Sequence, residues 1–181
     1  KKNFAVVGVG LIGGSFALKC KSKGLAHKVY GVDNNPAHSV QAIGLSLVDE
    51  MTDLETAIAN ADVVVISIPV NALADLLPRI LDLVDEQVVI DMGSTKRHIG
   101  AVVEAHPKRG RFVAAHPMWG TEYSGPTAAV ENAFENKAVI LCDLEKTDAD
   151  AVSIAEEIFT TMQMRMIQMN ANDHDLHAAY V

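Results

Sequence analysis

Residues 4–14 read Phe-Ala-Val-Val-Gly-Val-Gly-Leu-Ile-Gly-Gly, an apolar run of strand length that passes through glycines into a helical stretch. Glycines at positions 8, 10 and 13 match the pattern G-x-G-x-x-G, and Asp33 follows Gly13 by 20 residues, at the end of the next apolar run. A glycine loop between a strand and a helix, with an acidic residue ending the second strand, is typical of a dinucleotide-binding βαβ unit. We therefore predict that the N-terminal part of the chain binds a dinucleotide.

Apolar runs alternate with helical stretches along the rest of the chain. The predicted strands are residues 4–9, 29–32, 45–48, 63–68, 87–90, 112–115, 137–142 and 165–169. The predicted helices are residues 12–23, 36–44, 54–60, 73–83, 95–105, 148–162 and a last one that Asn172 and Asp173 cap and that runs to Val181. Strands that are apolar at nearly every position are buried on both faces, as in a parallel sheet. This pattern predicts a doubly wound α/β fold, with a mostly parallel Rossmann-type sheet and helices on both faces.

The glycine loop has a predicted task for each position. Gly8 permits the tight turn, Gly10 lets the backbone approach a pyrophosphate, and Gly13 lets the helix pack closely on the sheet. Leu11 and Ile12 lie in the first turn of the helix, where exposed amide groups and the helix dipole favour phosphate charge. Taken alone, the motif is also compatible with a glycine turn that binds no ligand.

Polar residues at other strand ends complete the predicted cofactor site. Asp33 would accept hydrogen bonds from the adenosine ribose and repel a 2′-phosphate, and no arginine follows it directly, so NAD is favoured over NADP. The alternative for Asp33 is a solvated turn aspartate. Ser67 and Pro69, at the end of the fourth strand, are predicted to line the cofactor cleft, because ligands bind at the carboxyl ends of the strands in such sheets.

The composition excludes several classes of protein. Of the 181 residues, 49% are hydrophobic and 21% are charged, which excludes intrinsic disorder. The 15 basic and 23 acidic residues give a net charge of −8, which disfavours broad binding to nucleic acid or to an anionic membrane. No apolar run approaches the ~20 residues that a membrane-spanning helix needs.

Cysteine use and the lack of a signal-peptide pattern predict a cytoplasmic protein. Cys20 and Cys142 lie in apolar stretches and are interpreted as reduced core thiols. The scattered histidines lack metal-ligand spacing, so no metal site is predicted. We interpret Asp173, His174, Asp175 and His177 as polar residues at a helix start.

Two further segments follow predicted strands at the same edge of the sheet. Residues 91–96 read Asp-Met-Gly-Ser-Thr-Lys, in which Ser94 can either cap the next helix or donate to a ligand. Lys96 is predicted in the first turn of that helix. Residues 116–125 read His-Pro-Met-Trp-Gly-Thr-Glu-Tyr-Ser-Gly. A histidine at the carboxyl end of a buried strand, beside a dinucleotide loop, is a candidate general base.

Together with residues 8–15, these two segments resemble the nucleotide-binding domain of the prephenate/arogenate dehydrogenase family, and the resemblance covers essentially the whole chain. It implies the NAD-dependent oxidative decarboxylation of prephenate to 4-hydroxyphenylpyruvate, in tyrosine biosynthesis. It also implies that His116 accepts the hydrogen bond of the substrate hydroxyl and that Ser94 orients this hydroxyl and the nicotinamide. Glu122, with Gly120, would lie at the mouth of the substrate site, and its alternative is a solvated loop carboxylate.

The resemblance further predicts the domain organisation. Residues 1–170 would form the dinucleotide-binding domain, and residues 171–181 would begin a C-terminal helical domain that is otherwise absent from the chain. In the family that helical domain forms the homodimer and supplies an arginine to the substrate carboxylate. Two alternatives stay open: an arogenate or other NAD-dependent hydroxy-acid dehydrogenase with the same domain, and a non-catalytic NAD(H)-binding module.

Overall fold

The apolar runs form one eight-stranded sheet in the computed structural model, which describes residues 1–179. The strands are β1 (Lys2–Val7), β2 (Ala26–Val32), β3 (Glu50–Met51), β4 (Val63–Ile66), β5 (Val88–Asp91), β6 (Phe112–Pro117), β7 (Ala138–Cys142) and β8 (Arg165–Met169). Their order is β3-β2-β1-β4-β5-β6-β7-β8, and every neighbouring pair is parallel except β6 and β7. The predicted doubly wound, mostly parallel sheet is confirmed, and the reversal at β7 adds a parallel β7–β8 pair at one edge.

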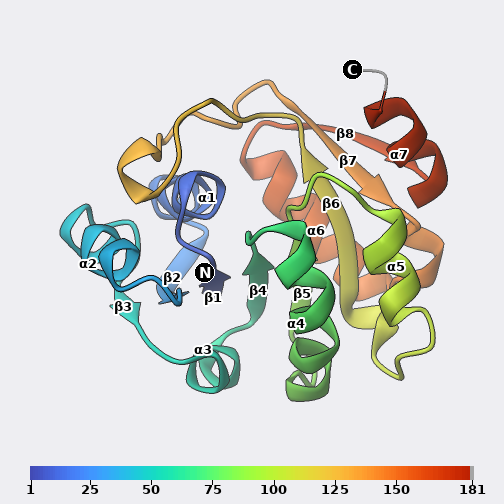
Figure 1. The fold of residues 1–181 in the computed structure, drawn as a ribbon, viewed down its shortest axis with the longest axis horizontal. Helices are drawn as coiled ribbons and strands as arrows, with labels where there is room; N and C mark the ends of the chain where they lie inside the picture. The colour runs from blue at the N-terminus through green and yellow to red at the C-terminus, as the bar shows by residue number, and fades with distance from the viewer. Residues whose placement is uncertain (180–181) are drawn as a thin grey trace.

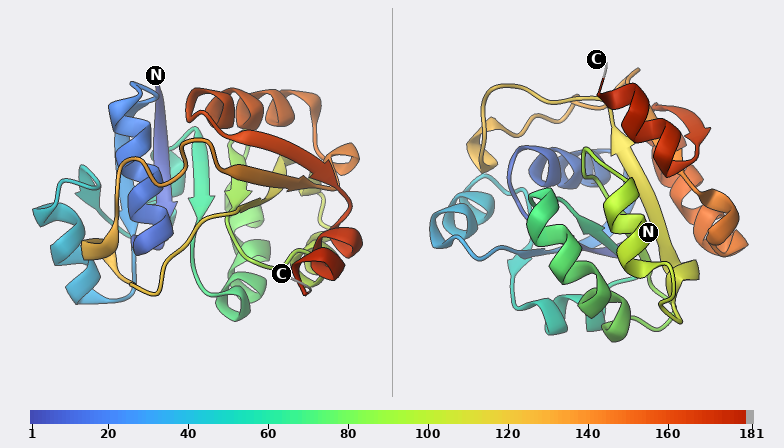
Figure 2. Two further views of the ribbon diagram at one scale, coloured as in Figure 1. Left: turned by 90° about the horizontal axis from the view of Figure 1, so that it is seen from above. Right: turned by 45° about the vertical axis from the view of Figure 1, so that its right-hand side comes forward.

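Helices cover both faces of the sheet (Figure 1). They are α1 (Leu11–Ser22), α2 (Pro36–Gly44), α3 (Leu54–Asn60), α4 (Val70–Leu83), α5 (Arg97–Val103), α6 (Ala149–Thr161) and α7 (Ala171–Ala178). Helices α1, α2 and α6 pack on one face, and α3, α4, α5 and α7 on the other; Figure 2 shows α6 and α4 on opposite sides. No helix within residues 1–179 is long and apolar enough to cross a membrane.

Strand β4 shows why the central strands are apolar at every position. Val63 and Val65 belong to the core on one face, and Val64 and Ile66 to the core on the other. All four side chains are 0% exposed. Burying each of them stabilises the fold by roughly 1.5–3 kcal/mol, so neither face of the strand has room for a polar residue.

Side-chain caps fix where several helices begin. Asp53 accepts a hydrogen bond from the Thr56 amide at 2.8 Å, which confirms the predicted cap of α3. For α7, the predicted cap at residues 172–173 is wrong, because Asn170 accepts from the Asp173 amide at 2.7 Å and starts the helix earlier. The predicted last residues of this helix, Tyr180 and Val181, lie outside the described residues.

The predicted third strand at residues 45–48 is wrong. The amides of Leu45 and Leu47 donate to carbonyl groups of α2, and Ser46 has a φ of 56°. These bonds wrap the chain around the end of the helix, so the pairing with β2 begins only at β3. Leu47 is nevertheless buried, at 2% exposure, as a core residue in a turn.

Segment 118–135 makes up most of the connection between β6 and β7, and it crosses the carboxyl edge of the sheet (Figure 1). It runs from β6 to the short helix η2 (Pro126–Ala128), which contacts α1 and α2, and then returns to β7. The Val130 amide donates to Ser15 Oγ at 3.0 Å, which fastens this crossing to α1. Residues remote in sequence therefore lie close to the glycine loop.

Candidate active site

A cleft of about 1170 Å³ opens at the carboxyl edge of the sheet, between β1, β2, β4 and β5. Its wall contains most of the predicted site residues, namely Gly8, Gly10, Leu11, Ile12, Asp33, Ser67, Pro69 and Ser94. Gly13 is buried behind this wall. His116, Gly120 and Glu122 do not belong to the described wall of the cleft.

The glycine loop forms a cradle with space above it. Gly8 has a φ of +91°, and a Cβ on it would meet the Ser67 carbonyl oxygen at 2.2 Å. A Cβ on Gly13 would meet the Gly8 carbonyl oxygen at 1.9 Å. The close contact between α1 and the loop therefore requires glycine at position 13. A Cβ on Gly10 would have no other atom within 4 Å, and no side chain caps α1. These residues fit a dinucleotide, because the first-turn amides of α1 have an open approach for a pyrophosphate.

Asp33 holds the glycine loop as well as facing the cleft. Its Oδ2 accepts from the Val9 amide at 3.0 Å, and its Oδ1 accepts from the Asn35 amide at 2.9 Å. His38 Nδ1 lies 3.4 Å from the same Oδ2. Oδ1 can accept a further bond, so the geometry leaves capacity for a ribose hydroxyl. Arg79 also lies in the wall, where its guanidinium contacts Glu55.

Segment 118–135 contributes three residues to the cleft wall that were not predicted as cofactor contacts. Tyr123, Ser124 and Gly125 reach the cleft because segment 118–135 crosses the sheet edge toward α2. Gly125 has a φ of +81°, and a Cβ there would lie 3.6 Å from His38 Nε2. Gly120 and Gly125 indicate a tight loop in this segment. The sequence alone does not show that the loop crosses the sheet edge toward α2.

A buried ion pair lies under the end of β5. Asp91 and Lys96 are both 0% exposed, and Asp91 Oδ2 contacts Lys96 Nζ directly. The carboxylate also accepts from the amides of Gly93 at 3.0 Å and Ala115 at 3.1 Å. Burial raises the pKa of Asp91, while Lys96 and these amides oppose that rise. The prediction that Lys96 lies in the first helical turn is wrong: it precedes α5 and turns inward, because Asp91 supplies its counter-charge.

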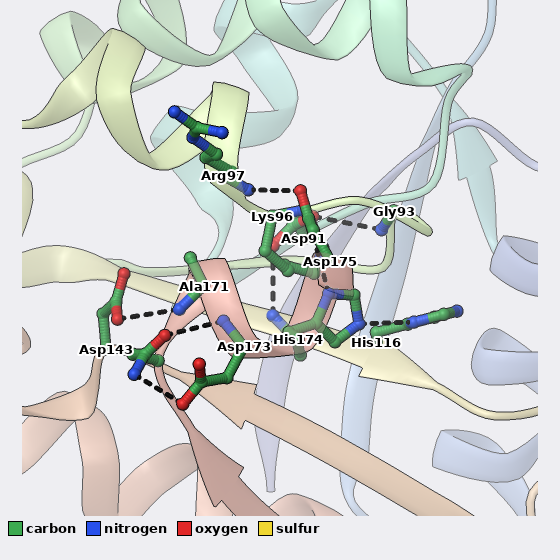
Figure 3. A network of polar contacts seen from close by, with 12 residues as sticks. Asp91, Gly93, Lys96, Arg97, His116, Asp143, Ala171, Asp173, His174 and Asp175 are labelled. Carbon is green, nitrogen blue, oxygen red and sulfur yellow. Dashed lines mark hydrogen bonds and ion pairs between the residues drawn. The ribbon is translucent and has the colours of Figure 1, made fainter. Parts of the chain in front are cut away.

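His116 lies inside β6, one residue further along the strand than its predicted end. Its side chain is half-buried, and its Nδ1 lies 2.8 Å from His174 Nε2 (Figure 3). Burial, together with the charge of Lys96 and the proximity of His174, lowers the pKa of His116 to about 4, whereas Asp175 acts in the opposite direction. The imidazole is therefore neutral near pH 7 and can accept a proton.

His174 is a site residue that the sequence analysis missed. It is 1% exposed, and its Nδ1 lies 2.8 Å from Asp175 Oδ1. Asp175 in turn accepts from the backbone amides of Lys96 at 2.8 Å and Arg97 at 3.0 Å. The available signal was a histidine four residues after the capping Asn170 and three after the buried Ala171, a spacing that places both side chains on the same face of α7.

Three further predicted site residues, Ser94, Gly120 and Glu122, are exposed in the structure. Ser94 is exposed on the cleft wall and does not cap α5, since the amides at that helix start are taken by Asp175. Gly120 and Glu122 are exposed in segment 118–135, after the end of β6. Their roles at a substrate site stay predictions. Within residues 1–179, no group of three or more His, Cys, Asp or Glu residues is placed to hold a metal ion.

Comparison with known proteins decides the family. The family described as "Prephenate dehydrogenase, nucleotide-binding domain" matches residues 16–168. The chain belongs to this family. A prephenate dehydrogenase of Bacillus subtilis is 31% identical over 179 residues, which is 97% of this chain and 48% of that protein. A cyclohexadienyl dehydrogenase of Zymomonas mobilis is 30% identical over 176 residues, or 96% of this chain and 60% of that protein.

Solved structures agree with this membership of the prephenate dehydrogenase family. The crystal structure of prephenate dehydrogenase from A. aeolicus, in complex with hydroxyphenyl propionate and NAD⁺, has a TM-score of 0.85 and 30% identity, and covers 97% of this chain and 62% of that one. The chain thus spans about half the length of the Bacillus relative and somewhat more of the other two.

Proposed function

We propose that residues 1–181 form the NAD⁺-binding part of an enzyme that oxidises and decarboxylates prephenate to 4-hydroxyphenylpyruvate. The observation that carries this proposal is the position of His116. It is a neutral, half-buried imidazole near the end of β6, beside the strand β5 whose end leads to Ser94 in the cleft wall. Membership of the prephenate dehydrogenase family supports the choice of substrate.

NAD⁺ is the cofactor that the cleft residues favour. The amides at the start of α1 would bind the pyrophosphate, and Asp33 would accept from the ribose hydroxyls and repel a 2′-phosphate. The A. aeolicus relative, which was solved with NAD⁺, supports this assignment. When bound, NAD⁺ supplies the acceptor for the hydride of the ring carbon that carries the substrate hydroxyl.

His116 performs the proton transfer in this proposal. It takes the proton of the substrate hydroxyl as the carbon–hydrogen bond at the same ring carbon breaks. It then returns a proton to that oxygen when the ring carboxylate has left as CO₂ and its electron pair has completed the aromatic ring. A positioned base of this kind contributes roughly 10²–10⁴-fold to a rate. Ser94 has its hydroxyl free of helix capping and would orient the substrate hydroxyl.

The substrate carboxylates need cationic partners, and two basic residues of the described part of the chain are already paired. Lys96 is fully buried against Asp91, and Arg79 contacts Glu55. We therefore propose that the arginine and the homodimer interface implied by the resemblance lie in a helical domain that begins at residue 171, with Glu122 and Gly120 at the mouth between the domains. A cytoplasmic location would suit Cys20 and Cys142, which are buried and unpaired.

The test is turnover by the full-length natural protein with NAD⁺ and a panel of prephenate, arogenate and simple hydroxy acids. We expect oxidation of prephenate with release of CO₂ and 4-hydroxyphenylpyruvate. Preference for arogenate would assign the enzyme to the other branch of the family. Oxidation of simple hydroxy acids alone, or NAD⁺ binding without any turnover, would contradict the proposal.

A further inference from the structure

We propose that His174 and Asp175 are positioning residues that hold His116 in the tautomer with a hydrogen on Nδ1 and a free lone pair on Nε2. The three side chains form a continuous chain of contacts from α7 to β6 (Figure 3). The inference rests on the proposed function for what the lone pair does, but the tautomer itself follows from the contacts alone.

The hydrogen positions are set from the Asp175 end of the chain. Partial burial by itself would raise the pKa of Asp175, but hydrogen bonds from His174 and from the amides of Lys96 and Arg97 outweigh it and lower that pKa. An ionised carboxylate only accepts hydrogen bonds. Therefore the nitrogen at 2.8 Å from Asp175 Oδ1, His174 Nδ1, carries a hydrogen and donates it.

The hydrogen on His174 Nδ1 also fixes the hydrogen of the His116 ring. A neutral imidazole has one N–H, so His174 Nε2 is an acceptor once Nδ1 is a donor. The nitrogen 2.8 Å away, His116 Nδ1, must then be the donor of that bond. His116 Nε2 is left without a hydrogen, which is the state that a base at this position requires.

The reverse arrangement requires a charge in an unfavourable place. A doubly protonated His174 would donate to His116 Nδ1 and move the hydrogen of His116 to Nε2. His174 is 1% exposed, so charging it costs desolvation. Lys96 lies on the same side of the site, beside Asp91, and its charge disfavours a positive charge on His116. Asp173 and Asp175 in α7, and Asp143 directly after β7, are acidic groups near this helix start.

Asp175 also couples this chain to the segment that carries Ser94. Its two oxygens accept from the amides of Lys96 at 2.8 Å and Arg97 at 3.0 Å, which begin α5 directly after that segment. One carboxylate therefore fixes the start of α5 and, through His174, the ring of His116. Asp175 therefore helps to position both His116 and the segment that carries Ser94, the two residues assigned to the substrate hydroxyl. It lies about 80 residues after Ser94 in the sequence.

The first test is the tautomer of His116 in the ligand-free 181-residue chain, measured by nitrogen–proton correlation NMR with ¹⁵N-labelled histidine near pH 7. The His116→Asn variant assigns the signal. We expect a protonated Nδ1 and an unprotonated Nε2. The His174→Leu variant should shift His116 toward the Nε2–H form, whereas His174→Gln, whose side-chain oxygen can accept the same bond, should retain the Nδ1–H form. His177→Leu, an exposed position on α7, is the matched control and should change nothing.

The second test uses the full-length natural protein with NAD⁺ and prephenate. His174→Leu should lower kcat roughly 10–100-fold, as loss of a partner that orients a functional histidine does, with little change in KM for NAD⁺, and His174→Gln should restore much of the loss. An Nε2–H tautomer in the unmodified chain would overturn the inference even if prephenate is turned over. The expected tautomer without any prephenate turnover would instead refute the proposed function and leave the positioning role standing.

Discussion

Asp33 is the residue whose charge should decide which dinucleotide binds. It holds the glycine loop through Val9 at 3.0 Å and faces the cleft with its remaining acceptor capacity. Asp33→Asn keeps an oxygen for the Val9 amide but removes the negative charge. Because hydrogen bonds to a charged group contribute roughly 1.5–3 kcal/mol, we expect NAD⁺ affinity to fall about tenfold or more and NADP⁺ affinity to rise. Calorimetric titration of the chain measures both, and equal affinity of the unmodified chain for the two dinucleotides would contradict this account.

His116 should make the stability of the fold depend on pH. Its pKa is lowered from 6.5 to about 4 in the folded chain, mainly by burial. The unfolded chain therefore takes up a proton first as the pH falls, so the stabilisation is complete above pH 6.5 and is lost progressively toward pH 4. Urea unfolding between these pH values should show a steeper loss of stability for the unmodified chain than for His116→Asn. Equal slopes would show that His116 titrates in the same range whether the chain is folded or unfolded.

At the scale of elements, the turn from β1 into α1 contains one glycine that serves dinucleotide binding, Gly10, and one that serves the stability of the fold, Gly13. A Cβ at Gly13 would collide with the Gly8 carbonyl oxygen at 1.9 Å, whereas a Cβ at Gly10 meets nothing within 4 Å. Gly10 has a φ of −79° and a ψ of −149°, so its backbone is not in the left-handed region that favours glycine. We expect Gly13→Ala to lower stability by roughly 1–3 kcal/mol. Gly10→Ala should lower stability less, because its methyl group meets no other atom, but it should weaken NAD⁺ binding, because the methyl group occupies the approach to the helix start.

Thermal melts without ligand and calorimetry with NAD⁺ distinguish the two glycine variants. The account fails if Gly10→Ala binds NAD⁺ as tightly as the unmodified chain, or if Gly13→Ala melts at the same temperature.

The features that the sequence predicts best are strands buried at every position and helix caps formed by neighbouring residues. Strand β4 is apolar throughout because both of its faces are buried, and Asp53 marks the start of α3 because its cap is local. The reversal of β7 relative to β6 depends on the path of segment 118–135, and no local pattern encodes it. Residues 45–48 are apolar enough for a strand, but the end of α2 captures their amides.

For the molecule as a whole, the cofactor residues and His116 itself could be predicted from sequence, but the side chains that surround His116 could not. The glycine loop and Asp33 form one contiguous motif, so their spacing carries the information. The contact of His116 with His174 spans 58 residues, and the burial of Lys96 depends on Asp91 beneath it. The contact between the two histidines exists only after β6 and α7 have come together.

The central claim is that His116 takes the proton of the substrate hydroxyl while the dinucleotide is bound in the cleft. The most direct test is the turnover of prephenate by the full-length natural protein carrying His116→Asn, at saturating NAD⁺, together with calorimetry of NAD⁺ binding. We predict that kcat falls roughly 10²–10⁴-fold and that NAD⁺ affinity is unchanged, because Gly10 and Asp33 belong to the cleft wall and His116 does not. Turnover at the unmodified rate would contradict the claim.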